Sequence, residues 1–228
     1  ISDYLINFYR NLGFRNKKIL LVPSTVDTHR FNINPPSPVS YDYICYCGSL
    51  TLEKDGVNIL IESFWRIASH YQALKLLLIG KGDTVEEEEA VKDLVRKLGA
   101  ENRVVFTGLM SRTEVPEYLC NARILALARP NSKIADAGFP SKLTEYLSTG
   151  RPVVVTKVGE IPVYLKDNET AFLCEPDSVD AFAERLDYVL KNYEHALAIG
   201  IKGRELTSTV FNYSYQTRRI SEFISSLR

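Results

Sequence analysis

Hydrophobic and polar positions along the chain follow two alternating periods. Short runs of aliphatic residues, typical of strands buried on both faces, are separated by segments whose apolar residues recur at spacings typical of helices. The predicted strands cover residues 18–22, 41–47, 74–79, 103–106, 124–128, 153–155 and 170–174. The predicted helices cover residues 1–13, 56–71, 86–98, 113–121, 140–149, 179–192 and two further segments up to residue 228. This alternation predicts an α/β fold, a doubly wound parallel sheet of about six strands with helices on both faces.

Loops rich in glycine and polar residues follow the predicted strands. In a doubly wound parallel sheet, ligands bind beyond the carboxyl ends of the strands, where the strand order reverses. The loops expected at those ends are residues 48–55, 80–84, 107–112, 129–141 and 156–162. We therefore expect a binding site along this edge of the sheet.

Residues 136–155 combine a lysine and a carboxylate near the start of a predicted helix. The segment predicts a polar loop, a short helix that begins at Pro140 and ends at Gly150, and a buried strand. Lys142 precedes Glu145 by about one helical turn. A helix N-terminus beside a lysine attracts phosphate, and a carboxylate one turn deeper can accept hydrogen bonds from two hydroxyls. The pattern predicts a site for a nucleotide with a phosphorylated tail; the alternative is that Lys142 pairs with Glu145 or lies in solvent.

The composition of the chain narrows the classes of protein. The 228 residues include 28 Lys and Arg and 28 Asp and Glu, so the chain lacks the basic excess that nucleic-acid-binding proteins carry. The four cysteines, Cys45, Cys47, Cys120 and Cys174, form no C-x2-C pair, so we expect no structural zinc, no disulfides and a reducing, cytoplasmic setting. No apolar run is long enough to predict a membrane span. Because the sequence begins without methionine or a signal-peptide pattern, we expect it to be a piece of a longer protein.

Two glycine-containing turns bear on other nucleotide-binding folds. Residues 80–82 follow a predicted strand, as a dinucleotide fingerprint would, but no glycine stands three positions later. NAD binding is therefore not favoured, and a Walker-type phosphate loop is absent from the sequence. Residues 48–56 also join a strand to a helix, and their backbone N–H groups together with Lys54 could face a phosphate. The alternative is an ordinary turn with an exposed lysine.

Several segments of the chain, taken in order, resemble one known family. The segments and the family patterns are residues 22–31 (usually P-N-G-V-D-x-x-x-F), 46–56 (G-R-L, then E-K-G), 76–82 (second strand and turn), 104–108 (V-x-F-x-G), 136–155 (the E-x7-E signature) and 159–162 (G-G-x-P-E). Together they resemble the C-terminal, donor-binding half of GT-B-fold glycosyltransferases, in particular glycosyltransferase family 4. That family comprises retaining enzymes that use sugar nucleotides.

The resemblance implies a division of the chain. Residues 1–37 would be the crossover from a preceding N-terminal, acceptor-binding domain. Residues 38–212 would be a Rossmann-like, donor-nucleotide-binding domain, and residues 213–228 a helix that returns toward the N-terminal domain. The family's catalytic histidine lies in that N-terminal domain, so the resemblance implies no catalytic residue in this chain. It also implies no essential metal and no other cofactor.

The resemblance further implies roles for individual residues. Glu145 matches the second signature glutamate and would hold the ribose hydroxyls, and Lys54 matches the lysine that neutralises the donor diphosphate. Residues 138–141 would bring backbone N–H groups to the donor, and the backbone around residues 108–109 would seat the base. The expected donor-binding residues are Gly48, Ser49, Lys54, Gly108, Leu109, Asp136, Gly138, Phe139, Pro140, Ser141, Lys142, Leu143 and Glu145.

Two positions depart from the family pattern. Ala137 stands where the first signature glutamate, which contacts the sugar, is expected, and Asp136 is beside it. Ser49 replaces the arginine of G-R-L, so one diphosphate cation is missing and Lys142 is a candidate to supply it.

These residues and the resemblance together lead to an expected function. We expect transfer of a sugar from a nucleotide diphosphate sugar to an acceptor hydroxyl, in the synthesis of a bacterial surface polysaccharide or glycolipid. The expected partners are the donor and, through the N-terminal domain, an acceptor sugar or glycolipid. We expect a cytoplasmic protein whose full-length form works at the inner face of the membrane. One alternative is a sugar-nucleotide epimerase or hydrolase, for which the loops show no arranged catalytic carboxylates or histidines. Another is a non-catalytic module that binds a nucleotide sugar or docks on a partner subunit, which Ala137 and Ser49 favour.

Overall fold

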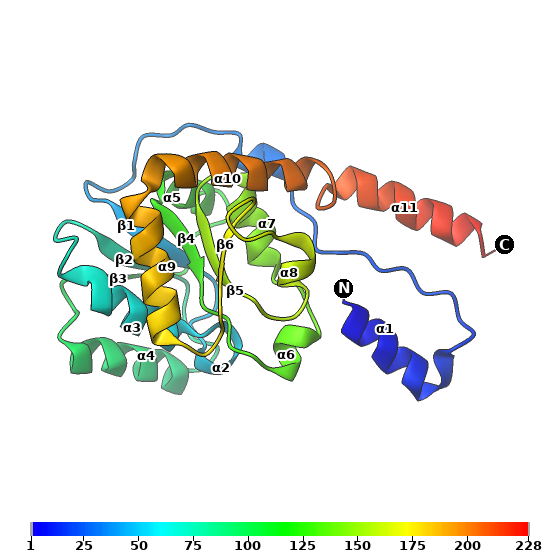
Figure 1. The fold of residues 1–228 in the computed structure, drawn as a ribbon, viewed down its shortest axis with the longest axis horizontal. Helices are drawn as coiled ribbons and strands as arrows, with labels where there is room; N and C mark the ends of the chain where they lie inside the picture. The colour runs from blue at the N-terminus through cyan, green and yellow to red at the C-terminus, as the bar shows by residue number, and fades with distance from the viewer. Residues whose placement is uncertain (1, 228) are drawn as a thin grey trace.

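A six-stranded parallel sheet forms the centre of the computed structural model, which describes residues 2–227 (Figure 1). The strand order is β3-β2-β1-β4-β5-β6. The strands are β1 (Tyr43–Cys47), β2 (Lys75–Ile79), β3 (Val104–Gly108), β4 (Ile124–Leu127), β5 (Val153–Thr156) and β6 (Phe172–Cys174). Every pair of neighbouring strands is parallel, which confirms the predicted α/β fold.

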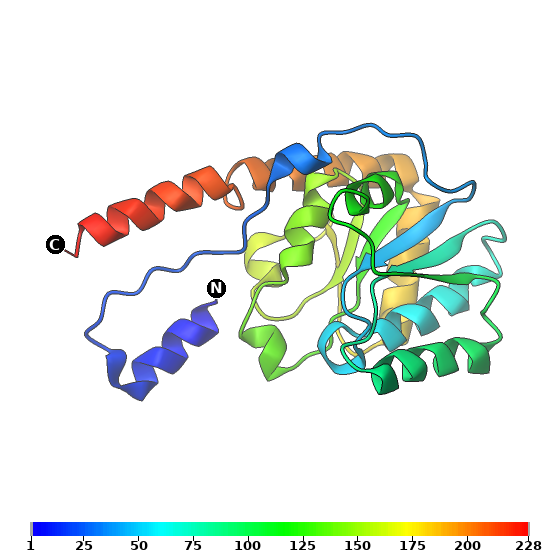
Figure 2. The ribbon, with the colours of Figure 1, turned by 180° about the vertical axis from the view of Figure 1, so that it is seen from behind.

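The described residues also form α-helices, several of which cover the two faces of the sheet (Figure 1). They are α1 (Asp3–Tyr9), α2 (Leu52–Asp55), α3 (Val57–Ala68), α4 (Val85–Leu98), α5 (Val115–Asn121), α6 (Lys133–Asp136), α7 (Ser141–Ser148), α8 (Ile161–Tyr164), α9 (Val179–Lys191), α10 (Tyr193–Ser208) and α11 (Tyr213–Ser225). Helices α3 and α9 pack together over one face, and Figure 2 shows α5 and α7 on the opposite face. Because both faces are covered, every residue of β4 and β5 is buried.

Helix α7 is held against the sheet by the apolar residues that its spacing predicts. Leu143, Tyr146 and Leu147 lie three and four positions apart and are fully buried. The helix ends before Gly150, whose φ of 72° is in the left-handed region that glycine adopts readily. Pro140 precedes the helix as its N-cap, so α7 begins one residue later than predicted. The polar face of α7 is therefore fixed in orientation by its buried face.

The predicted strand at residues 18–22 is wrong. Residues 18–25 have no regular secondary structure, and the first bridge after them joins Val26 to Asn212. Segment 18–22 instead lies beside α11, where Arg219 Nη1 donates to Leu21 O at 3.4 Å. A strand needs a neighbouring strand to satisfy its backbone groups, and within residues 2–227 none lies there. Two predicted loops also contain short helices, α2 within residues 48–55 and α6 within residues 129–141.

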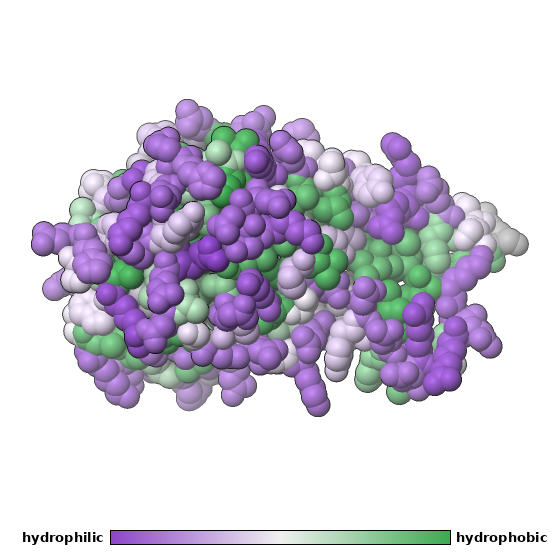
Figure 3. Space-filling view, viewed as in Figure 1, coloured by the Kyte–Doolittle hydropathy of each residue, from purple (hydrophilic) through white to green (hydrophobic). Residues whose placement is uncertain are grey.

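Both ends of the described chain extend away from the sheet on the same side. Helix α1, a π-helical turn η1 (Arg10–Phe14) and α11 lie there, with residues 15–27 running between α1 and α11 (Figure 1). Apolar side chains gather on this part of the surface (Figure 3). Those that are exposed are Tyr4, Phe8, Tyr9, Leu12, Phe14, Tyr213, Tyr215, Ile220, Ile224 and Leu227. Residues 1 and 228, the outer limits of the predicted crossover segment and C-terminal helix, lie outside the described residues.

No helix between residues 2 and 227 combines the length and apolar character that a membrane-spanning segment requires.

Candidate functional site

The strand order reverses between β1 and β4, so the loops that follow these two strands meet at the carboxyl edge of the sheet. The loop after β1 comprises residues 48–56, and the loop after β4 leads through α6 to α7. The two loops touch at Gly56, where an added Cβ would overlap the carbonyl oxygen of Ala128. Gly56 also has a φ of 65°, so glycine is needed there for both space and conformation. This contact places α2 and the start of α7 on either side of the switch point.

A buried ion pair joins these two loops. Lys142 Nζ of α7 lies 2.6 Å from Asp55 Oδ2 of α2 and donates a second hydrogen bond to Tyr46 Oη at 3.0 Å. Asp55 is only 2% exposed, and the Lys142 side chain is 17% exposed. Burial lowers the pKa of Lys142, and the adjacent Asp55 carboxylate opposes that change. The structure therefore excludes both alternatives considered for Lys142, a pair with Glu145 and a free position in solvent.

Gly48 leaves the space that the Lys142 ammonium occupies. An added Cβ on Gly48 would overlap Lys142 Nζ and would lie 2.8 Å from Tyr46 Oη. The φ of Gly48 is not in the left-handed region, so the constraint on this residue is space rather than backbone conformation. The ammonium thus lies directly on the first residue of the loop after β1, next to Ser49.

Glu145, one turn further along α7, has a different cationic partner. Arg30 Nη1 lies 2.6 Å from Glu145 Oε1, and Arg30 Nη2 donates to Arg112 O at 3.1 Å. Arg30 belongs to the short 3-10 helix η2 (Thr28–Phe31), and Arg112 to the loop after β3. Their contact with Glu145 brings together the crossover segment, the loop after β3 and α7.

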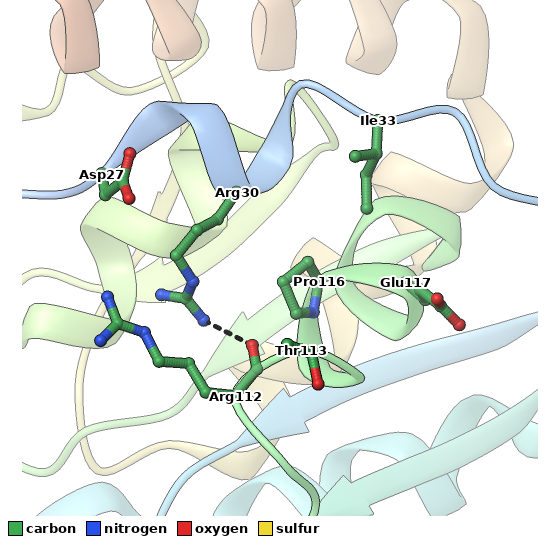
Figure 4. A pocket seen from close by; sticks show the side chains of 7 residues that line it. All are labelled: Asp27, Arg30, Ile33, Arg112, Thr113, Pro116 and Glu117. Atoms are coloured by element: carbon green, nitrogen blue, oxygen red, sulfur yellow. Dashed lines mark hydrogen bonds between the residues drawn. The ribbon is translucent and has the colours of Figure 1, made fainter.

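Two neighbouring cavities adjoin Arg30. One has a volume of about 340 Å³ and is lined by Thr25, Val26, Asp27, Arg30, Arg112, Ser141, Thr144 and Glu145. The other, of about 460 Å³, is lined by Asp27, Arg30, Ile33, Arg112, Thr113, Pro116 and Glu117. Figure 4 shows Arg30 pointing across the second cavity toward the backbone of Arg112. Hydrogen-bonding groups of both charges therefore face a space large enough for part of a nucleotide.

The expected donor-binding residues divide into three groups. Gly48, Ser49 and Lys142 lie together at the switch point, and Glu145 and Ser141 line the first cavity. Gly108 ends β3, which β2 separates from β1, and Gly80 N donates to Gly108 O at 2.9 Å. The exposed Leu109 follows it.

Other expected residues can face a ligand only through their backbone. Phe139 is 5% exposed because its ring stacks on Phe211 with centroids 5.1 Å apart. Leu143 is fully buried, and Pro140 has no N–H to donate. Gly138 precedes them as the link from α6 to this turn. These residues therefore contribute to a site by fixing the backbone course that leads into α7.

Among the described residues, Lys54 and Asp136 form no ion pair with Lys142 or Asp55, although the Lys54 charge adds to burial in lowering the pKa of Lys142. Lys54 is exposed on α2 and immediately precedes the buried Asp55. Asp136 ends the short helix α6 and is half-buried. The cation that the loop after β1 meets at close range is thus Lys142, which α7 supplies.

Ala137 lies beside the N-terminus of α1. The Ser2 hydroxyl donates to Ala137 O at 2.9 Å, and Asp3 N donates to Glu160 Oε1 at 2.8 Å. Glu160 is 6% exposed, and its Oε2 has no hydrogen-bond partner among residues 2–227. A buried carboxylate from the loop after β5 therefore lies near the position where the signature glutamate is absent.

Sequence reasoning missed Tyr46, Asp55, Arg30 and Arg112. Asp55 and Lys142 are 87 residues apart, and Arg30 and Glu145 are 115 apart, so no local spacing reveals either pair. The available signal was the order of the strands, which brings the ends of β1 and β4 together once the sheet is assigned.

The side chains at this site bear on the kinds of ligand that it could hold. Among the described residues, no group of three or more His, Cys, Asp and Glu side chains has the arrangement of a metal site. The four cysteines are free. Cations and a carboxylate that can accept hydrogen bonds suit a phosphorylated ligand that also carries hydroxyl groups.

Comparisons with known proteins identify the family of this chain. Residues 28–206 match the family described as glycosyl transferases group 1. N-acetyl-alpha-D-glucosaminyl L-malate synthase of Bacillus anthracis is 30% identical over 216 residues, which cover 90% of this chain and 53% of that protein. A putative colanic acid biosynthesis glycosyltransferase of Escherichia coli, WcaL, is 26% identical over 230 residues, covering 100% of this chain and 56% of that protein.

Solved structures show the same fold. The Anabaena protein HepE, in complex with UDP and glucose, has a TM-score of 0.78 and 19% identity to this chain. The match covers 89% of this chain and 55% of HepE. The chain spans about half the length of the curated relatives it matches.

Proposed function

Because the chain belongs to the glycosyl transferases group 1 family, we propose that it is the donor-binding half of a retaining glycosyltransferase. The donor would be a nucleotide diphosphate sugar. In the reaction, the bond between the anomeric carbon and the diphosphate oxygen breaks, and a new bond forms to the acceptor oxygen. The acceptor proton leaves to the released diphosphate or to solvent.

The observation that carries this proposal is the arrangement of α7 at the switch point. Its first turn offers Lys142 to the loop after β1, where a diphosphate would lie, and its second turn offers Glu145 to the cavity beside Arg112. Positive groups and backbone N–H groups at a helix start stabilise a leaving diphosphate without a metal ion. A carboxylate one turn away accepts hydrogen bonds from ribose. No essential metal is part of the proposal.

The acceptor and the catalytic histidine belong, in this proposal, to an N-terminal domain. Residues 1–37 and 213–228 would connect the donor domain to it, and their exposed apolar side chains would lie in that connection. One relative is named for L-malate and another for colanic acid. Because these molecules differ, the acceptor class proposed here is broad: a surface polysaccharide or glycolipid precursor. Work on such an acceptor would place the enzyme at the inner face of the membrane.

Nucleotide binding by the full-length protein tests the donor assignment. Isothermal titration calorimetry with UDP, GDP, ADP and dTDP, in the presence of EDTA, should show binding of at least one of them. Glu145→Ala should weaken that binding by about 1–3 kcal/mol, because a charged hydrogen-bond acceptor is lost. The variant should also lose its preference for the ribonucleotide over the matching 2′-deoxynucleotide.

A matched control is Glu101→Ala, which removes an exposed carboxylate in the turn before β3, at the opposite edge of the sheet. This variant should bind like the unmodified protein. Unchanged binding in Glu145→Ala would remove Glu145 from the site, and failure of all four nucleotides would refute the donor-binding proposal.

A non-catalytic nucleotide-sugar-binding or partner-docking module is the second candidate. Ala137 favours it, because the carboxylate expected to contact the sugar is absent at that position. The two candidates differ in one measurement on the full-length protein. Release of nucleoside diphosphate from a bound nucleotide sugar in the presence of acceptor supports the enzyme, whereas binding without release supports the module.

A further inference from the structure

The buried cluster of Tyr46, Asp55 and Lys142 has an organisation that a surface ion pair lacks. Asp55 Oδ2 lies 2.6 Å from Lys142 Nζ and 2.9 Å from Tyr46 Oη, and Lys142 also reaches Tyr46 at 3.0 Å. The three side chains come from α2, β1 and α7. Burial strongly raises the pKa of Tyr46, so its hydroxyl stays protonated and remains a donor. Lys142 is therefore held by two fixed partners on two other elements.

A second buried cation lies near this cluster. Arg129 follows β4, is 5% exposed, and is close enough for the Asp55 charge to act on its pKa, which burial lowers. Its Nη2 donates to Ile134 O at 2.8 Å, and its Nε has no hydrogen-bond partner among residues 2–227. Asp55 thus has two buried cations near it, Lys142 and Arg129. Two cations close together favour an anionic ligand between the loops.

The position of Asp55 explains why the Lys142 ammonium lies beside the loop after β1. Lys54, its neighbour, is exposed, whereas Asp55 turns inward and is 2% exposed. An inward carboxylate cannot neutralise a phosphate, but it can anchor a cation from another element. Gly48 leaves room for that cation at the mouth of the loop.

We propose that Asp55 and Tyr46 are positioning residues that hold the Lys142 ammonium beside Gly48. In that position the ammonium contacts the diphosphate of the donor. The inference rests on the proposed donor-binding function and adds how its diphosphate cation is held. Without Asp55, the lysine loses its countercharge in a buried place and moves away from the loop or loses its proton. Pre-organising a long, flexible side chain in this way reduces the conformational entropy lost when the ligand binds.

A double-mutant cycle on the full-length protein tests this inference. The probes are whichever of UDP and GDP binds the unmodified protein, and its nucleoside, uridine or guanosine. Asp55→Asn should raise the dissociation constant of the nucleoside diphosphate about tenfold, which corresponds to the loss of one charge-assisted hydrogen bond. The dissociation constant of the nucleoside should change by less than about twofold. Lys142→Met should cause a similar selective loss, and the double variant should bind no more weakly than Lys142→Met alone.

Two further variants make the result specific. Tyr46→Phe removes one hydroxyl and should cause a smaller loss of affinity, again for the nucleoside diphosphate rather than the nucleoside. A double-mutant cycle of Tyr46→Phe with Lys142→Met therefore tests the inference if Asp55→Asn fails to fold. Glu101→Gln removes an exposed carboxylate from the turn before β3, at the opposite edge of the sheet, and should leave both affinities unchanged.

Several results would overturn the inference. Asp55→Asn that leaves the affinity for the nucleoside diphosphate unchanged, or raises it, would show that the ion pair is purely structural. Equal losses of affinity for the nucleoside diphosphate and the nucleoside would show the same. So would a double variant whose loss of affinity equals the sum of the losses caused by Asp55→Asn and Lys142→Met. If neither UDP nor GDP binds the unmodified protein, the inference falls, and binding of ADP or dTDP then decides whether the donor-binding proposal falls with it.

Discussion

Lys142 and Glu145 lie three positions apart on helix α7, and their side chains contact partners on different elements. Lys142 is held by Asp55 and Tyr46, whereas Glu145 is held by Arg30. Each side chain therefore has a fixed direction before any ligand arrives. Such pre-organisation favours binding because fewer rotamers are lost when the ligand contacts them.

At the same scale, Gly48→Ala should weaken binding of a nucleoside diphosphate. The added Cβ would overlap the Lys142 ammonium, which must then move away from the loop after β1. We expect a loss of about 1–2 kcal/mol, because one charge-assisted contact to the diphosphate is lost while the charge stays in the protein. Calorimetry on the full-length protein measures the change.

The same substitution in a Lys142→Ala background is its control. Because the overlapping side chain is then absent, Gly48→Ala should cause little further loss. A large additional loss would show that the methyl group blocks the ligand directly rather than through Lys142.

Single residues show where sequence reasoning succeeds and where it stops. Lys142 and Glu145 could be named from the sequence, because both lie on one predicted helix. Their partners could not, because Asp55 and Arg30 approach through chain segments 87 and 115 residues away. The family resemblance predicts a phosphate contact for Lys54, whereas nothing in the sequence indicates that the adjacent Asp55 turns inward.

At the scale of elements, α7 is tied to the end of β1 by one hydroxyl. Cys47 N donates to Tyr146 Oη at 2.7 Å, and Tyr146 is fully buried. Tyr146→Phe removes this acceptor and leaves the N–H without its partner. We expect the free energy of unfolding to fall by about 1–3 kcal/mol, the cost of an unsatisfied buried group, measured by urea unfolding.

Tyr213→Phe is the matched control, since Tyr213 is 46% exposed on α11. That variant should unfold like the unmodified protein. Equal stability of Tyr146→Phe would mean that water or a shift of the backbone satisfies the Cys47 N–H.

The elements themselves were predictable to the extent that burial determined them. The aliphatic runs of β2, β4 and β5 are buried on both faces, and their sequence shows it. The run at residues 18–22 has a similar pattern but lacks a neighbouring strand among residues 2–227, so it stays irregular. Hydrophobic pattern predicts a strand only where a pairing partner exists, and the partner is a property of the tertiary structure.

At the scale of the whole molecule, the two edges of the sheet have different characters. The carboxyl edge carries the ion pairs of α7 and the cavities beside Arg30. The opposite edge also has a cavity, of about 390 Å³, lined in part by Asn32, Cys120, Arg151 and Arg204. Volume alone does not distinguish these sites. The switch point favours the carboxyl edge as the site of the proposed nucleotide.

Hydrogen–deuterium exchange on the full-length protein tests that placement. With a saturating nucleoside diphosphate, amides of residues 25–30, 48–56, 109–113 and 138–145 should exchange more slowly. These segments surround the switch point and the cavities beside Arg30, and a bound ligand suppresses their local opening. Residues 99–103 and 149–152, at the opposite edge, should not change. Protection confined to residues 149–152 and 197–204 would instead place the ligand in the cavity around Arg151, and the assignment of Lys142 and Glu145 would then be wrong.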